Sequence, residues 1–159
     1  MAESKYGKYF VRGPMPGETR ERFTHSVAYL DNDVIKGSFY FVFTFIRPEM
    51  EAITHGPHTH SHAEILGHFG TNPDDPFDLG AEITLYMGEE MEKHTFNQST
   101  LIYIPPKMVH CPIVYERVDR PFIFTYSMPT PVLQETSRKD LLPLVPEEIR
   151  SKIVFPYDD

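Results

Sequence analysis

The chain has 159 residues and a formal net charge of -8, and 40% of its residues are hydrophobic and 13% aromatic. This length suits one domain with a full hydrophobic core, and the apolar content excludes a disordered chain. The negative charge argues against a nucleic-acid or anionic-membrane partner, because both surfaces attract clustered lysine and arginine. No apolar run is long enough to span a bilayer, and the first ten residues lack the apolar core of a signal peptide. The single cysteine, Cys111, forms no internal disulfide, so we expect a cytoplasmic protein.

The chain divides into three parts by composition. Residues 1–36 are polar and broken by "GPMPGE" and "LDNDV", which predicts a mostly irregular N-terminal arm. Residues 37–130 are rich in β-branched and aromatic residues and are expected to form a barrel. Residues 131–159 form a tail with one short helix in "VPEEIRSKI", where Pro146 stands at the helix start and acidic residues follow in the first turn.

The central part contains a series of short runs typical of strands. The first, "SFYFVFTFIR" at 38–47, is aromatic and β-branched. Six more follow, separated by turn residues: "EILGHF", "AEITLYMG", "EKHTFN", "TLIYIP", "PIVYERV" and "PFIFTYSM". Many short strands with frequent turns predict an all-β, antiparallel sandwich or barrel.

The strand predicted at 38–47 is apolar on both faces. Alternation places four phenylalanines on one face and Tyr40, Val42 and Ile46 on the other. One face fills the barrel, and the other needs cover from the arm, the tail or a second subunit. We expect a homodimer.

The segment "HGPHTHSHAEILGHFG" at 55–70 holds five of the eight histidines. His58 and His60 are two apart, so on a strand they face the same side, about 6.6 Å from each other along the backbone. Glu64 follows a short turn, and the prolines of "PPKMVHCP" fix the approach to His110. Three imidazoles and one carboxylate predict a mixed nitrogen and oxygen site for a first-row divalent metal.

His68 is the candidate for a further role in the site. It lies four residues after Glu64, so strand parity places it on the same inner face unless Gly67 forms a bulge. At about 13 Å along the strand it is too far from Glu64 to share the ion. We expect it to contact a ligand at the far end of a pocket, or to hydrogen-bond a tyrosine such as Tyr86; a packed core histidine is the alternative.

The other histidines are weaker candidates. His62 keeps the alternation and competes as a ligand, although the turn before Glu64 is expected to break the face. His55, His94 and His25 lie in polar surroundings and are expected to be solvated surface residues.

Two motifs in this sequence resemble those of the cupin superfamily. "HTHSHAEILGHFG" matches the first motif with His58, His60, Glu64 and Gly70, and "STLIYIPPKMVH" matches the second with Pro105 and His110. Ser99 and Lys107 replace the two usual glycines of the second motif. The resemblance covers about residues 38–127. It implies an antiparallel cupin-type barrel, also called a double-stranded β-helix or jelly roll, and a metal bound by the four residues His58, His60, Glu64 and His110.

This fold hosts many chemistries, so the function stays open between several classes. The first is a metal-dependent enzyme of dioxygenase, isomerase or lyase type that acts on a small molecule, with Fe, Mn, Ni or Zn as the divalent ion. The second is a non-catalytic module, a sensor for example, that binds a small ligand through the metal. A structural metal site is least favoured, because such sites prefer closed tetrahedral coordination, often with cysteine.

Overall fold

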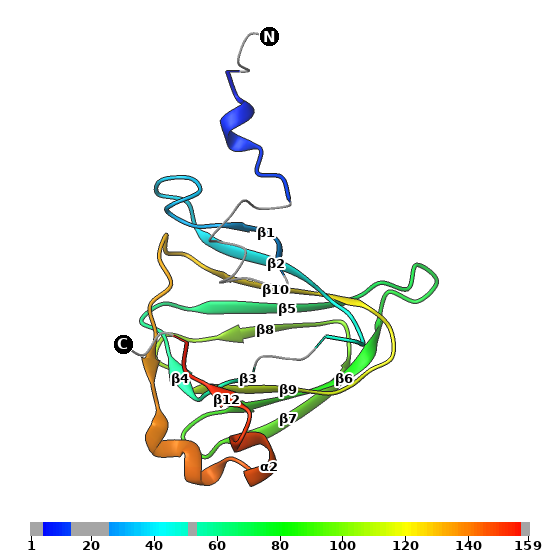
Figure 1. Ribbon diagram of the computed structural model, residues 1–159, viewed down its shortest axis with the longest axis vertical. Coiled ribbons are helices and arrows are strands. Elements are labelled where there is room, and N and C mark those ends of the chain that lie inside the picture. The colour runs from blue at the N-terminus through cyan, green and yellow to red at the C-terminus, as the bar shows by residue number, and fades with distance from the viewer. Residues whose placement is uncertain (1–4, 14–25, 51–53, 157–159) are drawn as a thin grey trace.

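The computed structural model describes residues 5–13, 26–50 and 54–156 (Figure 1). Most of these residues belong to two five-stranded antiparallel sheets or to the loops between their strands. The first contains, in spatial order, β1 (Ser26–Leu30), β2 (Tyr40–Ile46), β10 (Phe122–Met128), β5 (Glu64–Gly70) and β8 (Thr100–Ile104). The second contains β11 (Thr136–Ser137), β4 (His58–Thr59), β9 (His110–Val118), β6 (Asp78–Met87) and β7 (Glu92–Gln98). A short parallel pair joins β3 (Thr54–His55) to β12 (Ile153–Val154).

The chain passes repeatedly from one sheet to the other. β5 is in the first sheet, β6 and β7 are in the second, β8 returns to the first, β9 lies in the second and β10 in the first. Neighbours within a sheet are therefore mostly distant in sequence, as in a jelly roll. This topology confirms the predicted all-β, antiparallel cupin-type barrel.

The two ends of the chain differ in part from the expectation. β1 lies inside the segment predicted to be a mostly irregular arm and pairs with β2 at the edge of the first sheet. Its pairing shifts register between Ser26 and Ala28, and beyond the shift Tyr29 lies opposite Val42 and is buried, whereas Val27 stays exposed. The short 3-10 helix η1 (Gly7–Tyr9) precedes it. The boundaries 1–36, 37–130 and 131–159 themselves stay predictions.

The predicted C-terminal helix is present as α2 (Glu147–Arg150), with Pro146 directly before it. The 3-10 helix η2 (Lys139–Leu144) precedes it, and both lie against the second sheet, where Leu141 and Val145 pack on Tyr86 and Val109 (Figure 1). No helix among the described residues is long and apolar enough to cross a membrane.

β2 separates an inner from an outer face, as its sequence predicts. Tyr40, Val42 and Ile46 are buried, whereas Phe39 is 70% and Phe41 is 40% exposed. The outer row continues across the sheet, because Phe41 pairs with Ser127, Ser127 with Ile65 and Ile65 with Tyr103. The first sheet thus carries an exposed apolar face with Phe41, Ile65, Phe69, Leu101 and Tyr103 on it.

Candidate metal centre

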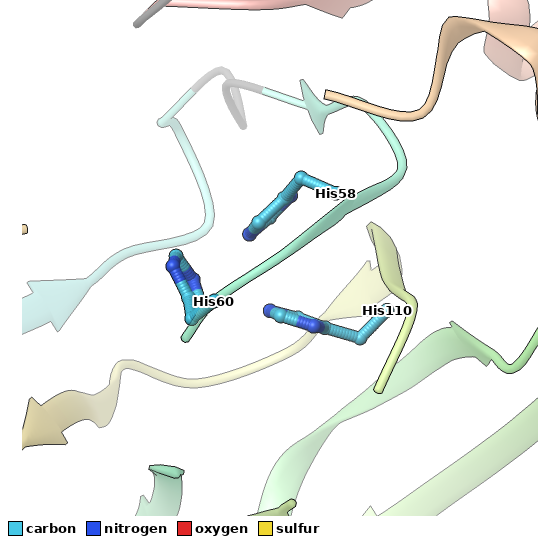
Figure 2. A group of neighbouring side chains, drawn as sticks. All are labelled: His58, His60 and His110. Atoms are coloured by element: carbon cyan, nitrogen blue, oxygen red, sulfur yellow. The ribbon is translucent and has the colours of Figure 1, made fainter. Parts of the chain in front are cut away.

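Three histidines meet between the two sheets, next to the β4–β9 ladder. His58 and His110 are direct cross-strand partners, so their rings lie close, with centroids 4.2 Å apart. His60 follows β4 by one residue and points to the same side as His58, with ring centroids 4.8 Å apart. Figure 2 shows the three rings turned toward one another. Each offers one nitrogen, and these nitrogens lie within 4.8 Å of one another.

The Nδ1 atom of each ring donates a hydrogen bond to a backbone carbonyl. His58 donates to Gly56 at 2.8 Å, His60 to Gln134 at 2.7 Å and His110 to Met108 at 3.1 Å. A carbonyl oxygen only accepts, so Nδ1 carries the hydrogen, and in the neutral ring Nε2 carries the lone pair. The three lone pairs therefore face the shared space, as in histidines that bind metals.

Glu64 brings a carboxylate to the same space from the first strand residue of β5. Its Oε2 lies 3.0 Å from Nε2 of His110 and 3.6 Å from Nε2 of His60. The side chain is 6% exposed, and Oε2 has no hydrogen-bond partner among the described residues. The structure therefore brings together all four residues that the sequence proposed as ligands.

Burial lowers the pKa of His58 well below its ordinary value, and the neighbouring His110 and His55 lower it further. Burial also lowers the pKa of His60, although Glu64 partly opposes the shift. Both rings are thus neutral near pH 7 and keep their lone pairs on Nε2. Electron-pair donors and a buried carboxylate that face one another repel unless a cation lies between them. The donor set therefore fits a divalent transition metal.

The turn before His110 ties the two histidine segments together. The backbone N–H of Lys107 donates to the carbonyl of His60 at 2.8 Å. Lys107 has φ 65°, in the left-handed region that favours glycine. This backbone conformation explains why glycine is usual at this position of the second cupin motif "STLIYIPPKMVH". In this chain a lysine adopts the same conformation.

His68 lies on the inner face, as strand parity predicts. β5 pairs with both neighbours over residues 65–68 without a register shift, so Gly67 forms no bulge. The His68 side chain is fully buried beside Phe96, Phe122 and Phe124, with ring centroids 5.2, 6.1 and 4.8 Å away. Burial lowers its pKa to about 3.

The expected hydrogen bond from His68 to a tyrosine is not formed. Neither ring nitrogen has a hydrogen-bond partner among the residues that the structure describes. Tyr86 packs elsewhere, against Met91, Val109 and the C-terminal helices. The predicted role of His68 in ligand contact stays a prediction.

Two other histidines lie at the surface. His62 is exposed, and its Nδ1 lies 2.9 Å from the Ser61 hydroxyl, so it turns away from the cluster. His94 is 51% exposed, as expected, and lies 3.5 Å from Glu92. His25 lies outside the described residues.

His55 differs from the expectation of a solvated surface residue. Its side chain is 27% exposed, and its ring lies 4.7 Å from that of His58. The C-terminal segment causes this burial, because Val154 pairs with His55 and Glu135 approaches its Nε2 to 3.4 Å. The sequence around His55 could not indicate this burial, because the covering residues are distant in the chain.

Glu135 was missed by the sequence analysis. With His55 and His58 it forms a second group of possible metal ligands within 4.8 Å of one another. Glu135 stands in the tail sequence "LQETS", with no spacing that relates it to the histidine motifs. The short strand β11, which pairs with β4, returns it to the site.

A pocket of about 550 Å³ lies on the outward side of this region. Thr59 and Ser61 line it, and they alternate with the inward-facing His58 and His60. The other lining residues come from the tail: Leu133, Gln134, Glu135, Thr136 and Pro156. Glu135 therefore belongs both to this lining and to the histidine cluster.

Comparison with models of known protein families finds no match, and comparison with curated proteins finds no similar sequence. Among solved structures, an oxalate decarboxylase from Lactobacillus farciminis is 16% identical, with a TM-score of 0.48, over 88% of this chain. The chain spans only 37% of the length of that protein. An uncharacterized protein with a double-stranded β-helix domain from Klebsiella pneumoniae is 13% identical over 79% of this chain and 90% of its own, with a TM-score of 0.46. A DMSP lyase from Ruegeria pomeroyi is 16% identical over 64% of this chain and 43% of its own, with a TM-score of 0.39. Similarity at this level does not extend to an activity or a substrate.

Proposed function

We propose that this protein is a metal-dependent cupin that acts on a small organic molecule through a site of three histidines and one glutamate. One observation carries the proposal: the Nε2 lone pairs of His58, His60 and His110 converge, each fixed by an Nδ1 hydrogen bond to the backbone. Glu64 adds the negative charge that favours a cation over a neutral guest.

The protein's own residues hold and orient the ion, and the ion, when bound, polarises a carbonyl or hydroxyl group or takes part in oxygen chemistry. His58 and His110 would hold the ion from one ladder, and Glu64 would hold it from the opposite sheet. The reaction is of dioxygenase, isomerase or lyase type, with Fe, Mn, Ni or Zn as the divalent metal. A non-catalytic module that binds a small ligand through the metal is the alternative.

The assignment of the ligands is tested by elemental analysis after purification without chelator. Wild type is expected to contain metal near one equivalent, and His58→Ala or His110→Ala to lose most of it. His94→Ala is the matched control, because it removes an exposed imidazole. Full metal content in both His58→Ala and His110→Ala would refute the site.

Turnover separates the enzyme from the binding module. The metal-loaded protein is assayed against a panel of dicarbonyls, catechols and hydroxy acids, with His58→Ala as the inactive reference. Metal-dependent turnover of any member supports an enzyme. Saturable binding without turnover supports the ligand-binding module.

His68 keeps its predicted role in ligand binding or turnover as part of this proposal. Support comes from its two buried nitrogens without hydrogen-bond partners in the described part of the chain, since unpaired buried polar atoms are rare in native proteins. His68→Phe is expected to retain metal and fold but to weaken turnover or ligand affinity. Unchanged function with metal intact would make it a core residue.

We also propose that a second copy of the chain covers the apolar face of the first sheet. The aligned row of exposed apolar residues Phe41, Ile65 and Tyr103 supports a contact with the same face of a second copy. Light scattering at micromolar concentration is expected to give a dimer, and a double change of Phe41→Ser with Ile65→Ser a monomer. Phe77→Ser is the control, because Phe77 is 75% exposed but lies in the loop between β5 and β6. A monomeric wild type would refute the dimer.

The cytoplasm remains the proposed location of the protein.

A further inference from the structure

Glu135 is a buried carboxylate beside the proposed metal ligands, and the four-ligand site does not use it. Its side chain is 1% exposed, and neither oxygen has a hydrogen-bond partner among the described residues. Oε2 lies 3.9 Å from Nε2 of His58, and Oε1 lies 3.4 Å from Nε2 of His55. An ionised carboxylate in such surroundings is strongly destabilising unless a positive charge compensates it.

The backbone on both sides of Glu135 is attached to the segment that carries the histidines. Before it, the carbonyl of Gln134 accepts the hydrogen bond from Nδ1 of His60. After it, Thr136 pairs with Thr59, and the N–H of Arg138 donates to the carbonyl of Pro57 at 2.8 Å. Glu135 is therefore held by the same contacts that orient the ligands, as a residue built into the site would be.

His58 cannot supply the compensating proton in its neutral form. Its Nδ1–H is used by the carbonyl of Gly56, so the Nε2 that faces Glu135 carries a lone pair. The lone pair of His58 Nε2 and the carboxylate of Glu135 thus face each other in a buried place and repel each other. A cation between them would remove this repulsion.

The two possible ligand groups share one atom. His58 belongs to the group with His60 and His110 and to the group with His55 and Glu135, and Nε2 is its one available nitrogen. The two groups meet at this nitrogen, and the 3.9 Å contact with His58 is the distance by which Glu135 adjoins the four-ligand site. Around an octahedral ion with bonds of about 2.1 Å, adjacent ligand atoms lie about 3.0 Å apart and opposite ones about 4.2 Å apart. The distance of 3.9 Å from Glu135 to His58 falls inside this range, as do the 3.0 and 3.6 Å distances made by Glu64.

We infer that Glu135 is a fifth protein ligand of the same ion and that His55 holds its second oxygen in place. The inference rests on the proposed metal centre and narrows what that centre accepts. Five protein ligands leave an octahedral ion one open position, which suits a substrate that binds through a single donor atom. Two carboxylates also neutralise a divalent ion, so the site favours a neutral carbonyl or hydroxyl group over an anionic one.

Manganese binding to the full-length, metal-free protein tests the assignment. Glu135→Gln keeps the size of the side chain and removes its charge, and we expect Mn²⁺ to bind it roughly 10- to 100-fold more weakly than wild type. Water-proton relaxation of bound Mn²⁺ is expected to show one exchangeable water in wild type and two in Glu135→Gln. His55→Gln should weaken binding less, because His55 acts through Glu135.

Glu92→Gln is the matched control. Glu92 also lies beside a histidine, 3.5 Å from Nε2 of His94, but its side chain is 72% exposed and outside the cluster. Affinity and water number should equal those of wild type.

The melting temperature without metal separates a ligand from a structural ion pair with His55. If Glu135 is a ligand, Glu135→Gln removes an uncompensated charge, and the metal-free variant should melt at or above wild type while gaining less from Mn²⁺. A lower melting temperature without metal, with unchanged Mn²⁺ affinity and water number, would overturn the assignment and leave the four-ligand centre intact. Failure of wild type to bind any divalent transition metal would instead overturn the proposed centre. If Glu135→Gln does not fold, Glu135→Asp is measured by the same criteria.

Discussion

The barrel holds buried histidines in two different environments. At one end, His58, His60 and His110 each use Nδ1 to bond a backbone carbonyl and aim Nε2 at a shared space. Further along β5, His68 is as deeply buried, but phenylalanine rings surround it and neither nitrogen is bonded within the described structure. Burial depresses the pKa of His58 and His68 alike.

The difference shows that burial and neutrality do not by themselves give a histidine the geometry to bind a metal. The cluster has in addition a fixed tautomer, convergent lone pairs and a carboxylate, and His68 has none of these. Added metal should therefore raise the free energy of unfolding through the histidine cluster alone. The loss of stability that acid causes through His68 should be the same with and without metal.

The largest expected effect is the stabilisation of the cluster by metal. At a free metal concentration 100-fold above Kd, binding to the folded state adds about 2.7 kcal/mol to the free energy of unfolding. For a chain of this size that corresponds to a rise in Tm of roughly 5–10 °C. His68→Phe should show the same rise and His58→Ala almost none, measured by thermal unfolding with and without Mn²⁺. An equal rise in His58→Ala would contradict the distinction between the two environments.

A smaller effect is expected from acid on His68. Its pKa is about 3 in the folded protein and about 6.5 in the unfolded chain, so between these values the unfolded state binds a proton that the folded state excludes. The contribution of His68 to the free energy of unfolding is therefore fully present above about pH 6.5. Below that pH the free energy of unfolding falls by roughly 1.4 kcal/mol per pH unit, which amounts to about 2.7 kcal/mol at pH 4.5.

Comparison of metal-free wild type with His68→Phe isolates this contribution. In denaturant unfolding from pH 7.5 to 4.5, the free energy of unfolding should fall less with decreasing pH in His68→Phe than in wild type. A difference between the two proteins that stays constant with pH would report how well the larger phenylalanine ring fits. His58 and His60 titrate in both proteins and cancel in the difference. Parallel profiles would show that His68 is not the neutral, desolvated group described here.

Much of the fold was predictable because its signals are local. Each predicted strand from "SFYFVFTFIR" to "PFIFTYSM" has its own β-branched and aromatic residues and its own flanking turns, and each is present in the barrel. β1 was missed because its five residues stand beside polar segments, and its burial depends on the edge of β2. A five-residue pattern is too short to stand out without its partner strand.

The candidate site was predictable to the same extent. His58, His60 and Glu64 are close in sequence, and His110 follows a proline turn that marks it. Glu135 and the burial of His55 depend on a tail segment that pairs with β4 and β3 across more than 70 residues. No periodicity connects these positions, so no pattern in the sequence indicates the contact.

The smallest expected effect concerns the turn that joins the two histidine segments. Lys107 has φ 65°, a conformation that is unfavourable for an L-residue by roughly 1 kcal/mol and free of that strain for glycine. Lys107→Gly should therefore raise the free energy of unfolding by up to about 1 kcal/mol, less the entropy that glycine gains in the unfolded chain.

Lys107→Ala separates the backbone from the side chain in this test. Alanine removes the ammonium group but keeps the Cβ, so it should not gain the stability that glycine gains. Both variants keep the N–H that donates to His60, and Mn²⁺ affinity should equal that of wild type in each. A gain in Lys107→Ala equal to that in Lys107→Gly, measured by denaturant unfolding, would assign the effect to charge and not to backbone strain.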